Sequence, residues 1–165
     1  MSVYTFQPMI VDKAKQIATW KYEGMYSFYN MDESDEDIEE LMNGNFYYAT
    51  DVQGELIGFI CFGDSARVSG GYGAGLYEND EILDFGLGLK PDYTGKGIGR
   101  GFVEQGIRFL QQQFKMKQLQ LVVAEFNRRA IQVYERAGFI RGIGFKSTVK
   151  KQEVEFITMS YMIKR

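Results

Sequence analysis

Glycines stand at every second position near the middle of the chain, from Gly95 to Gly101, with Lys96 and Arg100 among them. A glycine lets a backbone N–H group approach an anion closely because no Cβ is in the way. If a helix begins here, its first N–H groups are unpaired and lie at the positive end of its dipole. The stretch therefore predicts a phosphate-binding loop, although an ordinary glycine-rich turn would have a similar composition.

The spacing of these glycines does not fit two common nucleotide-binding motifs. The dinucleotide pattern G-x-G-x-x-G would need its last glycine at Arg100 or at Phe102. The P-loop pattern needs Ser or Thr after Gly-Lys, and here Gly97 stands at that position. The sequence thus favours a phosphate ligand of another kind.

A second stretch whose side chains could take part in binding or catalysis lies at 127–139 and reads N-R-R-A-I-Q-V-Y-E-R-A-G-F. Asn127 is a suitable N-cap for a helix, and Gly138 is suitable for the position just after its end. Tyr134 would lie on the inner face of this helix, as an ordinary core tyrosine does.

Together the two stretches resemble the two signatures of the GNAT superfamily of N-acetyltransferases. Residues 94–99 match Arg/Gln-x-x-Gly-x-Gly/Ala, except that Thr94 stands where Arg or Gln is usual. The second signature, Asn-x-x-Ala-x-x-x-Tyr-x-x-x-Gly-Phe, is matched at Asn127, Ala130, Tyr134, Gly138 and Phe139. The order of predicted elements agrees along essentially the whole chain, so the resemblance implies one GNAT-like domain over residues 1–165.

This resemblance implies an α/β, GNAT-like (acyl-CoA N-acyltransferase) fold. It would have a central mixed, mostly antiparallel seven-stranded sheet, flanked by about four helices, with parallel and splayed strands four and five. It also implies direct transfer of an acetyl group from acetyl-CoA to a primary amine of a small molecule or a peptide N-terminus, through a ternary complex. Residues implied to bind the cofactor are Leu87, Gly88, Leu89, Gly95, Lys96, Gly97, Ile98, Gly99, Arg100, Asn127 and Tyr134.

Two of these assignments concern the reaction itself. One N–H group among residues 87–89 would hold the oxyanion that forms from the thioester carbonyl, and Tyr134 would protonate the departing sulfur. The base is open: Asp84 is the first candidate, with Glu81, Glu125 and ordered water as alternatives. Asp84 could instead be a structural hydrogen-bond acceptor in an otherwise apolar strand.

The composition limits the other possibilities. The 165 residues include no His and a single Cys61, which we expect to be buried and inert. We therefore expect no metal site, no disulfide and no acyl-enzyme, and a cytoplasmic setting. The net charge of −3 and the lack of a long apolar run argue against nucleic-acid and membrane partners. A homodimer is the default expectation for assembly.

Three functions stay open at this point. The first is an acetyl-CoA-dependent N-acetyltransferase, and the second is an acyl-CoA sensor of the same fold without turnover. The third is an unrelated nucleotide or phosphate binder. An aromatic cluster at residues 20–29 and an acidic run at 32–40 are candidates for contact with a cationic amine, although the acidic run also suits the start of a solvated helix.

Hydrophobic periodicity gives the elements that would position these residues. Strands are predicted at 3–7, 45–50, 55–63, 82–89, 118–124, 139–149 and 153–163. Helices are predicted from an Asp12 cap to Tyr22, through the acidic run to Asn43, from the glycine loop to Phe114, and at 127–137. Residues 64–80, rich in glycine, are predicted to be a flexible loop, either plain or part of an acceptor site.

Overall fold

A computed structural model describes residues 3–163 of the chain. Its centre is one seven-stranded sheet, with the spatial order β1-β2-β3-β4-β5-β7-β6. Only β4 and β5 are parallel, and every other neighbouring pair is antiparallel. The strands are β1 (Thr5–Pro8), β2 (Phe46–Thr50), β3 (Leu56–Phe62), β4 (Ile82–Leu89), β5 (Gln118–Ala124), β6 (Ile140–Val149) and β7 (Gln152–Met162).

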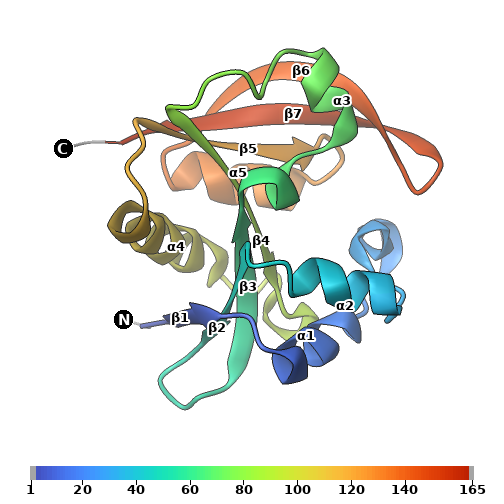
Figure 1. Cartoon of the computed structure of the whole chain (residues 1–165), viewed down its shortest axis with the longest axis vertical. Coiled ribbons are helices and arrows are strands. Elements are labelled where there is room, and N and C mark those ends of the chain that lie inside the picture. The colour runs from blue at the N-terminus through green and yellow to red at the C-terminus, as the bar shows by residue number, and fades with distance from the viewer. Residues whose placement is uncertain (1–2, 164–165) are drawn as a thin grey trace.

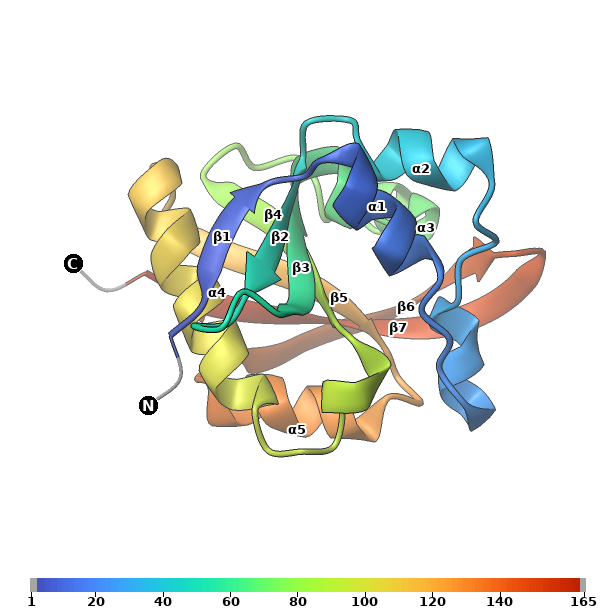
Figure 2. The same cartoon turned by 90° about the horizontal axis from the view of Figure 1, so that it is seen from below.

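Helices cover both faces of this sheet (Figures 1 and 2). On one face lie α4 (Gly99–Gln113) and α5 (Arg128–Arg136), and on the other lie α1 (Val11–Ala18), α2 (Asp35–Leu41) and the short α3 (Ser69–Gly73). Three 3₁₀ turns complete the described part of the chain: η1 (Gly24–Tyr29), η2 (Gly63–Ala66) and η3 (Pro91–Tyr93). None of the helices in residues 3–163 is long and apolar enough to cross a membrane.

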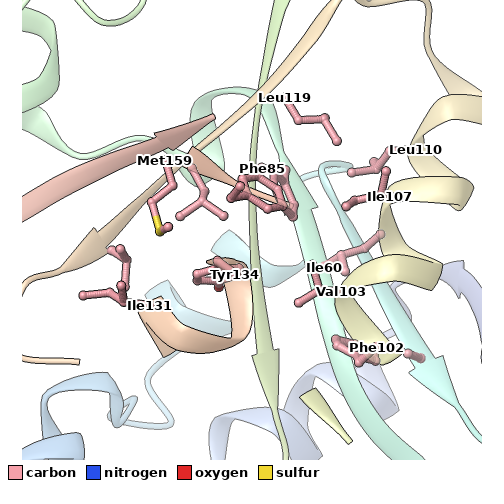
Figure 3. Packing of buried hydrophobic residues seen from close by; sticks show 14 of the residues in the cluster. Ile60, Phe85, Phe102, Val103, Ile107, Leu110, Leu119, Ile131, Tyr134 and Met159 are labelled. Atoms are coloured by element: carbon pink, nitrogen blue, oxygen red, sulfur yellow. The ribbon is translucent and has the colours of Figure 1, made fainter. Parts of the chain in front are cut away.

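Two apolar clusters hold the layers together. The larger one lies between the sheet and the α4–α5 face, and it includes Phe85, Phe102, Leu119 and Tyr134 (Figure 3). The smaller one joins α1 and α2 to the opposite face through Trp20 and its neighbours. The strands β3 and β5 therefore bury side chains on both faces of the sheet, which explains why they read as nearly continuous apolar runs.

The predicted strands and helices are confirmed in type and order, but the first helix begins and ends at other residues than predicted. The first helix ends at Ala18 instead of Tyr22 and begins after Ile10, so Asp12 is not its cap. It ends early because Trp20 turns into the core, where it is 7% exposed and its ring stacks 6.3 Å from that of Phe59.

Residues 64–80, predicted as an irregular loop, contain η2 and α3. Their glycines serve close packing. The Gly70 N–H donates to the Ser147 hydroxyl at 2.8 Å, and a Cβ on Gly70 would collide with the Lys146 carbonyl oxygen. A Cβ on Gly71 would lie 2.6 Å from the Tyr77 hydroxyl oxygen. The segment is thus fitted against β6.

Candidate functional site

The site begins where β4 and β5 separate. These parallel strands pair only along Ile82–Asp84 and Gln118–Gln120. Beyond that point β4 stays paired with β3 and β5 stays paired with β7, so the sheet opens as a V between them. One edge of β4 and one edge of β5 therefore lack a strand partner, and both edges face the opening.

The direction of the β4 backbone groups follows from its pairing with β3. The Lys90 N–H donates to the Ile57 carbonyl at 2.8 Å, so it points toward β3. Because direction alternates along a strand, the Gly88 N–H also points toward β3, while those of Leu87 and Leu89 point into the opening. The Leu89 carbonyl is engaged there by the Tyr22 hydroxyl at 2.5 Å. Of the three predicted oxyanion donors, the geometry thus favours Leu87 and Leu89.

The glycine loop forms one end of the opening. Gly95 and Gly97 have φ values of +70° and +80°, a conformation that L side chains rarely adopt. Within residues 3–163, no backbone N–H group from Gly95 to Gly101 has a hydrogen-bond acceptor. The helix α4 begins inside this row at Gly99, so its dipole adds positive potential to free donors. Such a row of N–H groups is suited to an anion with several oxygens.

A cleft of about 580 Å³ joins this loop to the opening between the strands. Most of the predicted cofactor-binding residues line it: Leu87, Gly88, Leu89, Gly95, Gly97, Gly99, Arg100, Asn127 and Tyr134. Lys96 and Ile98 belong to the loop but do not line the cleft. The Arg100 guanidinium lies at the loop and forms a salt bridge to Glu104 at 2.9 Å.

Thr94, the residue that departs from the motif, has a local role. Its hydroxyl donates to the Pro91 carbonyl at 2.8 Å and closes the η3 turn. A cationic side chain from α5 lies close to this loop. Arg129 lines the cleft, and its Nη1 lies 3.3 Å from the position that a Cβ on Gly95 would occupy. The sequence reasoning missed Arg129, although its place in the first turn of a helix beside a predicted phosphate site was a usable signal.

Tyr134 projects from α5 into the core and reaches the cleft. The side chain is 8% exposed, and its hydroxyl has no hydrogen-bond partner in the described part of the chain. Burial raises the pKa of the Tyr134 hydroxyl above its ordinary value, with small further increases from Tyr29 and Cys61. The phenol is therefore protonated at neutral pH and has a proton to donate.

Asn127 connects the cleft wall to the start of α5. Its side-chain oxygen accepts from the Ala130 N–H at 3.1 Å, which confirms the predicted N-cap. Its amide nitrogen donates to the Tyr29 hydroxyl at 3.0 Å. Asn127 thus fixes the helix start and holds η1 over the cleft.

The structure places Asp84 apart from the cleft. Its side chain lies on the face of β4 covered by η2, where one oxygen accepts from Gln120 Nε2 and the other from Arg67 Nε, both at 2.8 Å. Burial raises the pKa of Asp84 above its ordinary value, while the hydrogen bonds from Gln120 and Arg67 lower it. A carboxylate that is engaged by two donors and does not line the cleft is suited to a structural role. Glu81 and Glu125 do not line the cleft either.

Aromatic side chains form another part of the cleft wall. We call Trp20, Tyr22, Tyr26, Tyr29 and Phe59 the aromatic wall, and all five line the cleft. The predicted acidic run lies elsewhere: Asp35, Glu36 and Asp37 form the first turn of α2, and no Asp or Glu of the described residues lines the cleft. Cys61 is buried as predicted, and burial raises the pKa of its thiol to about 12, so it is inert at neutral pH.

A sheet that opens between two parallel strands, with a glycine-rich loop and a helix start beside the opening, defines an α/β protein with a cleft suited to an extended ligand. The sequence profile of the acetyltransferase (GNAT) family matches residues 11–139. The chain belongs to this family, which implies acetyl-CoA as the donor.

Individual proteins add detail to this assignment. A solved acetyltransferase (GNAT family) from Bacillus anthracis superposes with a TM-score of 0.73 at 14% identity, covering 96% of this chain and 94% of the other. A spermidine/spermine N-acetyltransferase from Vibrio cholerae gives 0.66 at 18% identity, covering 96% and 92%. These two share the fold. A mycothiol acetyltransferase from Propionibacterium freudenreichii is 40% identical over 53 residues, which cover 32% of this chain and only 17% of that relative.

Proposed function

We propose that this protein transfers the acetyl group of acetyl-CoA directly to a primary amine within a ternary complex. The observation that carries this proposal is the row of N–H groups from Gly95 to Gly101 without acceptors, next to the opening between β4 and β5. Such a row would hold the pyrophosphate of the donor. The opening would then receive the donor's extended arm as if it were an added strand.

The chemistry follows from the residues that face this opening. Acetyl-CoA supplies an activated thioester carbonyl. The N–H groups of Leu87 and Leu89 would hold the oxyanion that forms when the amine nitrogen attacks this carbonyl. As the carbon–sulfur bond breaks, Tyr134 would give its proton to the sulfur and later regain one from water.

Loss of the amine's proton is assigned to water in the cleft. A free alkylamine has a pKa of about 10 and must be neutral to attack. The cleft places arginines and aromatic rings around the acceptor, and Asp84 is held by Arg67 and Gln120 and does not line the cleft. A side-chain base is therefore not part of the proposal.

The first test is donor binding. Thermal unfolding with acetyl-CoA, ATP and NAD should show stabilisation by acetyl-CoA, about 2.7 kcal/mol when the ligand is at ~100 times its Kd. Release of free CoA should then be followed with a panel of amines. Stabilisation by ATP but not by acetyl-CoA would overturn the proposal. Tight acetyl-CoA binding without turnover of any amine would favour the sensor function.

A further inference from the structure

We propose that the acceptor is a monoamine carried on an aromatic or extended aliphatic group, and that polyamines are rejected. This inference rests on the proposed acetyl transfer and concerns the aromatic wall of the cleft. It is carried by two features: an apolar aromatic lining beside the reacting strand, and positive charge as the sole side-chain charge of the cleft within residues 3–163.

The aromatic wall lies directly against β4, where the acetyl group would be placed. The Phe59 ring covers Gly88 so closely that a Cβ there would lie 2.5 Å from a ring carbon. Trp20 stacks on Phe59 with ring centroids 6.3 Å apart, and the Tyr22 hydroxyl bonds the Leu89 carbonyl. An amine that approaches this strand therefore meets rings first.

The outer part of the wall is held in place by side chains of α5 and its cap. Tyr29 accepts a hydrogen bond from Asn127 at 3.0 Å, and its ring meets that of Tyr22 edge-on at 6.4 Å. The Arg129 guanidinium lies over the Tyr26 ring, 4.4 Å from its centroid. These contacts make the wall a fitted surface whose face is apolar.

The charged side chains that line the cleft are Arg100, Arg129 and Arg136. They match an anionic donor, and they disfavour an acceptor that carries additional positive charge. The acidic run does not offset them. Asp37 accepts from the Asp32 N–H at 2.7 Å, Glu33 lies 4.0 Å from Lys21, and none of the run's carboxylates lines the cleft.

This environment also explains how a neutral nucleophile can arise without a side-chain base. Transfer of an ammonium group into an apolar site disfavours the charged form, which lowers the pKa of the amine. An acceptor with a single amino group becomes neutral as it enters, and its hydrocarbon part packs on the rings. A diamine or polyamine leaves a second ammonium group beside rings and arginines with no carboxylate to pair it.

The test uses two acceptors of equal length. Heptylamine and hexamethylenediamine differ only in that a terminal methyl group is replaced by an amino group. With acetyl-CoA as donor and release of free CoA as readout, we expect kcat/KM for heptylamine to be at least about tenfold higher. Phenethylamine should also exceed spermidine. Faster turnover of the diamine or of spermidine would overturn the inference.

A substitution at the edge of the aromatic wall gives an independent test. Met31 lines the cleft and is half-buried, so Met31→Glu would place a carboxylate beside the rings. The ratio of heptylamine to hexamethylenediamine turnover should fall by about tenfold. Met31→Gln, which is similar in size and uncharged, measures the effect of polarity and packing alone. An equal change in both variants would contradict the charge argument.

The donor control separates this inference from the proposed function. Binding of acetyl-CoA is measured by thermal shift before any acceptor is added. If acetyl-CoA binds and polyamines are the better acceptors, the acceptor inference fails while the proposed transfer stands. If acetyl-CoA does not bind, the proposed function itself fails.

Discussion

Replacing Asp84 with Asn distinguishes a structural carboxylate from a catalytic base. Both Asp84 oxygens accept hydrogen bonds at 2.8 Å, one from Gln120 Nε2 and one from Arg67 Nε. An amide keeps the shape but has only one acceptor oxygen, so its NH₂ group must face a donor in either orientation. We therefore expect Asp84→Asn to lower stability and to leave the chemistry of the cleft nearly unchanged.

The size of the effect follows from the two hydrogen bonds that this carboxylate accepts. One buried donor without a partner costs about 1–3 kcal/mol. The Arg67 guanidinium would also keep only the exposed Asp64 as a carboxylate partner. For a chain of this length, each 1 kcal/mol lowers Tm by roughly 2–4 °C. A destabilisation of about 2 kcal/mol thus corresponds to a fall in Tm of ~4–8 °C, measured by differential scanning calorimetry.

The same residue contributes a pH dependence with a defined sign. Burial raises the pKa of folded Asp84 above its ordinary value of about 4 in the unfolded chain. The folded state therefore holds this proton more tightly, so the contribution to stability is greatest below the unfolded pKa. It declines as pH rises through the raised folded pKa. Asp84→Asn should lack this part of the decline when unfolding is measured at several pH values.

The activity of the Asp84→Asn variant tests whether Asp84 is structural or is the general base. If Asp84 were the general base, its loss should reduce kcat by about 10²–10⁴-fold in protein that is still folded, and should abolish the acidic limb of the pH profile. We expect less than about a threefold change. As a control, Arg67→Gln should destabilise by a similar amount. The double variant should be destabilised by less than the sum of the two because the side chains are in contact.

Three further predictions follow from the site. Tyr134→Phe should lower kcat by about 10²–10⁴-fold, with the acetyl-CoA Kd and the Tm nearly unchanged, because its hydroxyl bonds to none of the described residues. A retained rate would assign the proton to water. Arg129→Gln should raise the acetyl-CoA Kd, measured by calorimetry, by about tenfold or more, and unchanged affinity would remove Arg129 from the donor site. Gly88→Ala should lower the free energy of unfolding by about 1–3 kcal/mol, because the new methyl group would lie 2.5 Å from the Phe59 ring. Gly101→Ala is the control in thermal unfolding, because a Cβ at Gly101 would have no atom within 4 Å.

The strands that open the sheet could be predicted from sequence because their signals are local. The alternation of Leu83, Phe85, Leu87 and Leu89, followed by Pro91, predicted the bounds 82–89 that the structure has. The apolar run 118–124 likewise matches β5. The mixed, splayed arrangement depended on the family resemblance, because periodicity does not tell which strands pair.

Residues 64–80 could not be predicted because what orders them is distant in the chain. The α3 helix has five residues and contains three glycines, so its own propensity is poor. Its Gly70 N–H is bonded to Ser147, 77 positions away, and its register is set by that contact. Glycines selected for close packing look the same in sequence as glycines selected for flexibility.

The candidate site also contains residues that local motifs predict and residues whose role depends on distant parts of the chain. The glycine loop, Asn127 and Tyr134 were predicted by motif and do line one cleft. Asp84 is polar in an apolar strand, which predicts a role in the site, but its carboxylate is bonded to Arg67 and Gln120 and does not line the cleft. Which side chains cover Asp84 depends on the fold of η2, and that information is not local. The role of Asp84 stays a prediction to be tested by substitution.

The tip of the β6–β7 hairpin is bonded to η1 and to the residue after it, so a change at this tip could alter which acceptor binds. Lys150 donates from this tip to the carbonyls of Phe28 and Asn30, at 3.0 and 2.6 Å, across separations of 122 and 120 residues. The hairpin lies outside residues 11–139, which match the family. A hairpin outside the residues that match the family profile thus anchors η1, which carries Tyr26 and Tyr29. Selectivity could therefore be re-engineered by grafting hairpin tips, with the donor loop left untouched.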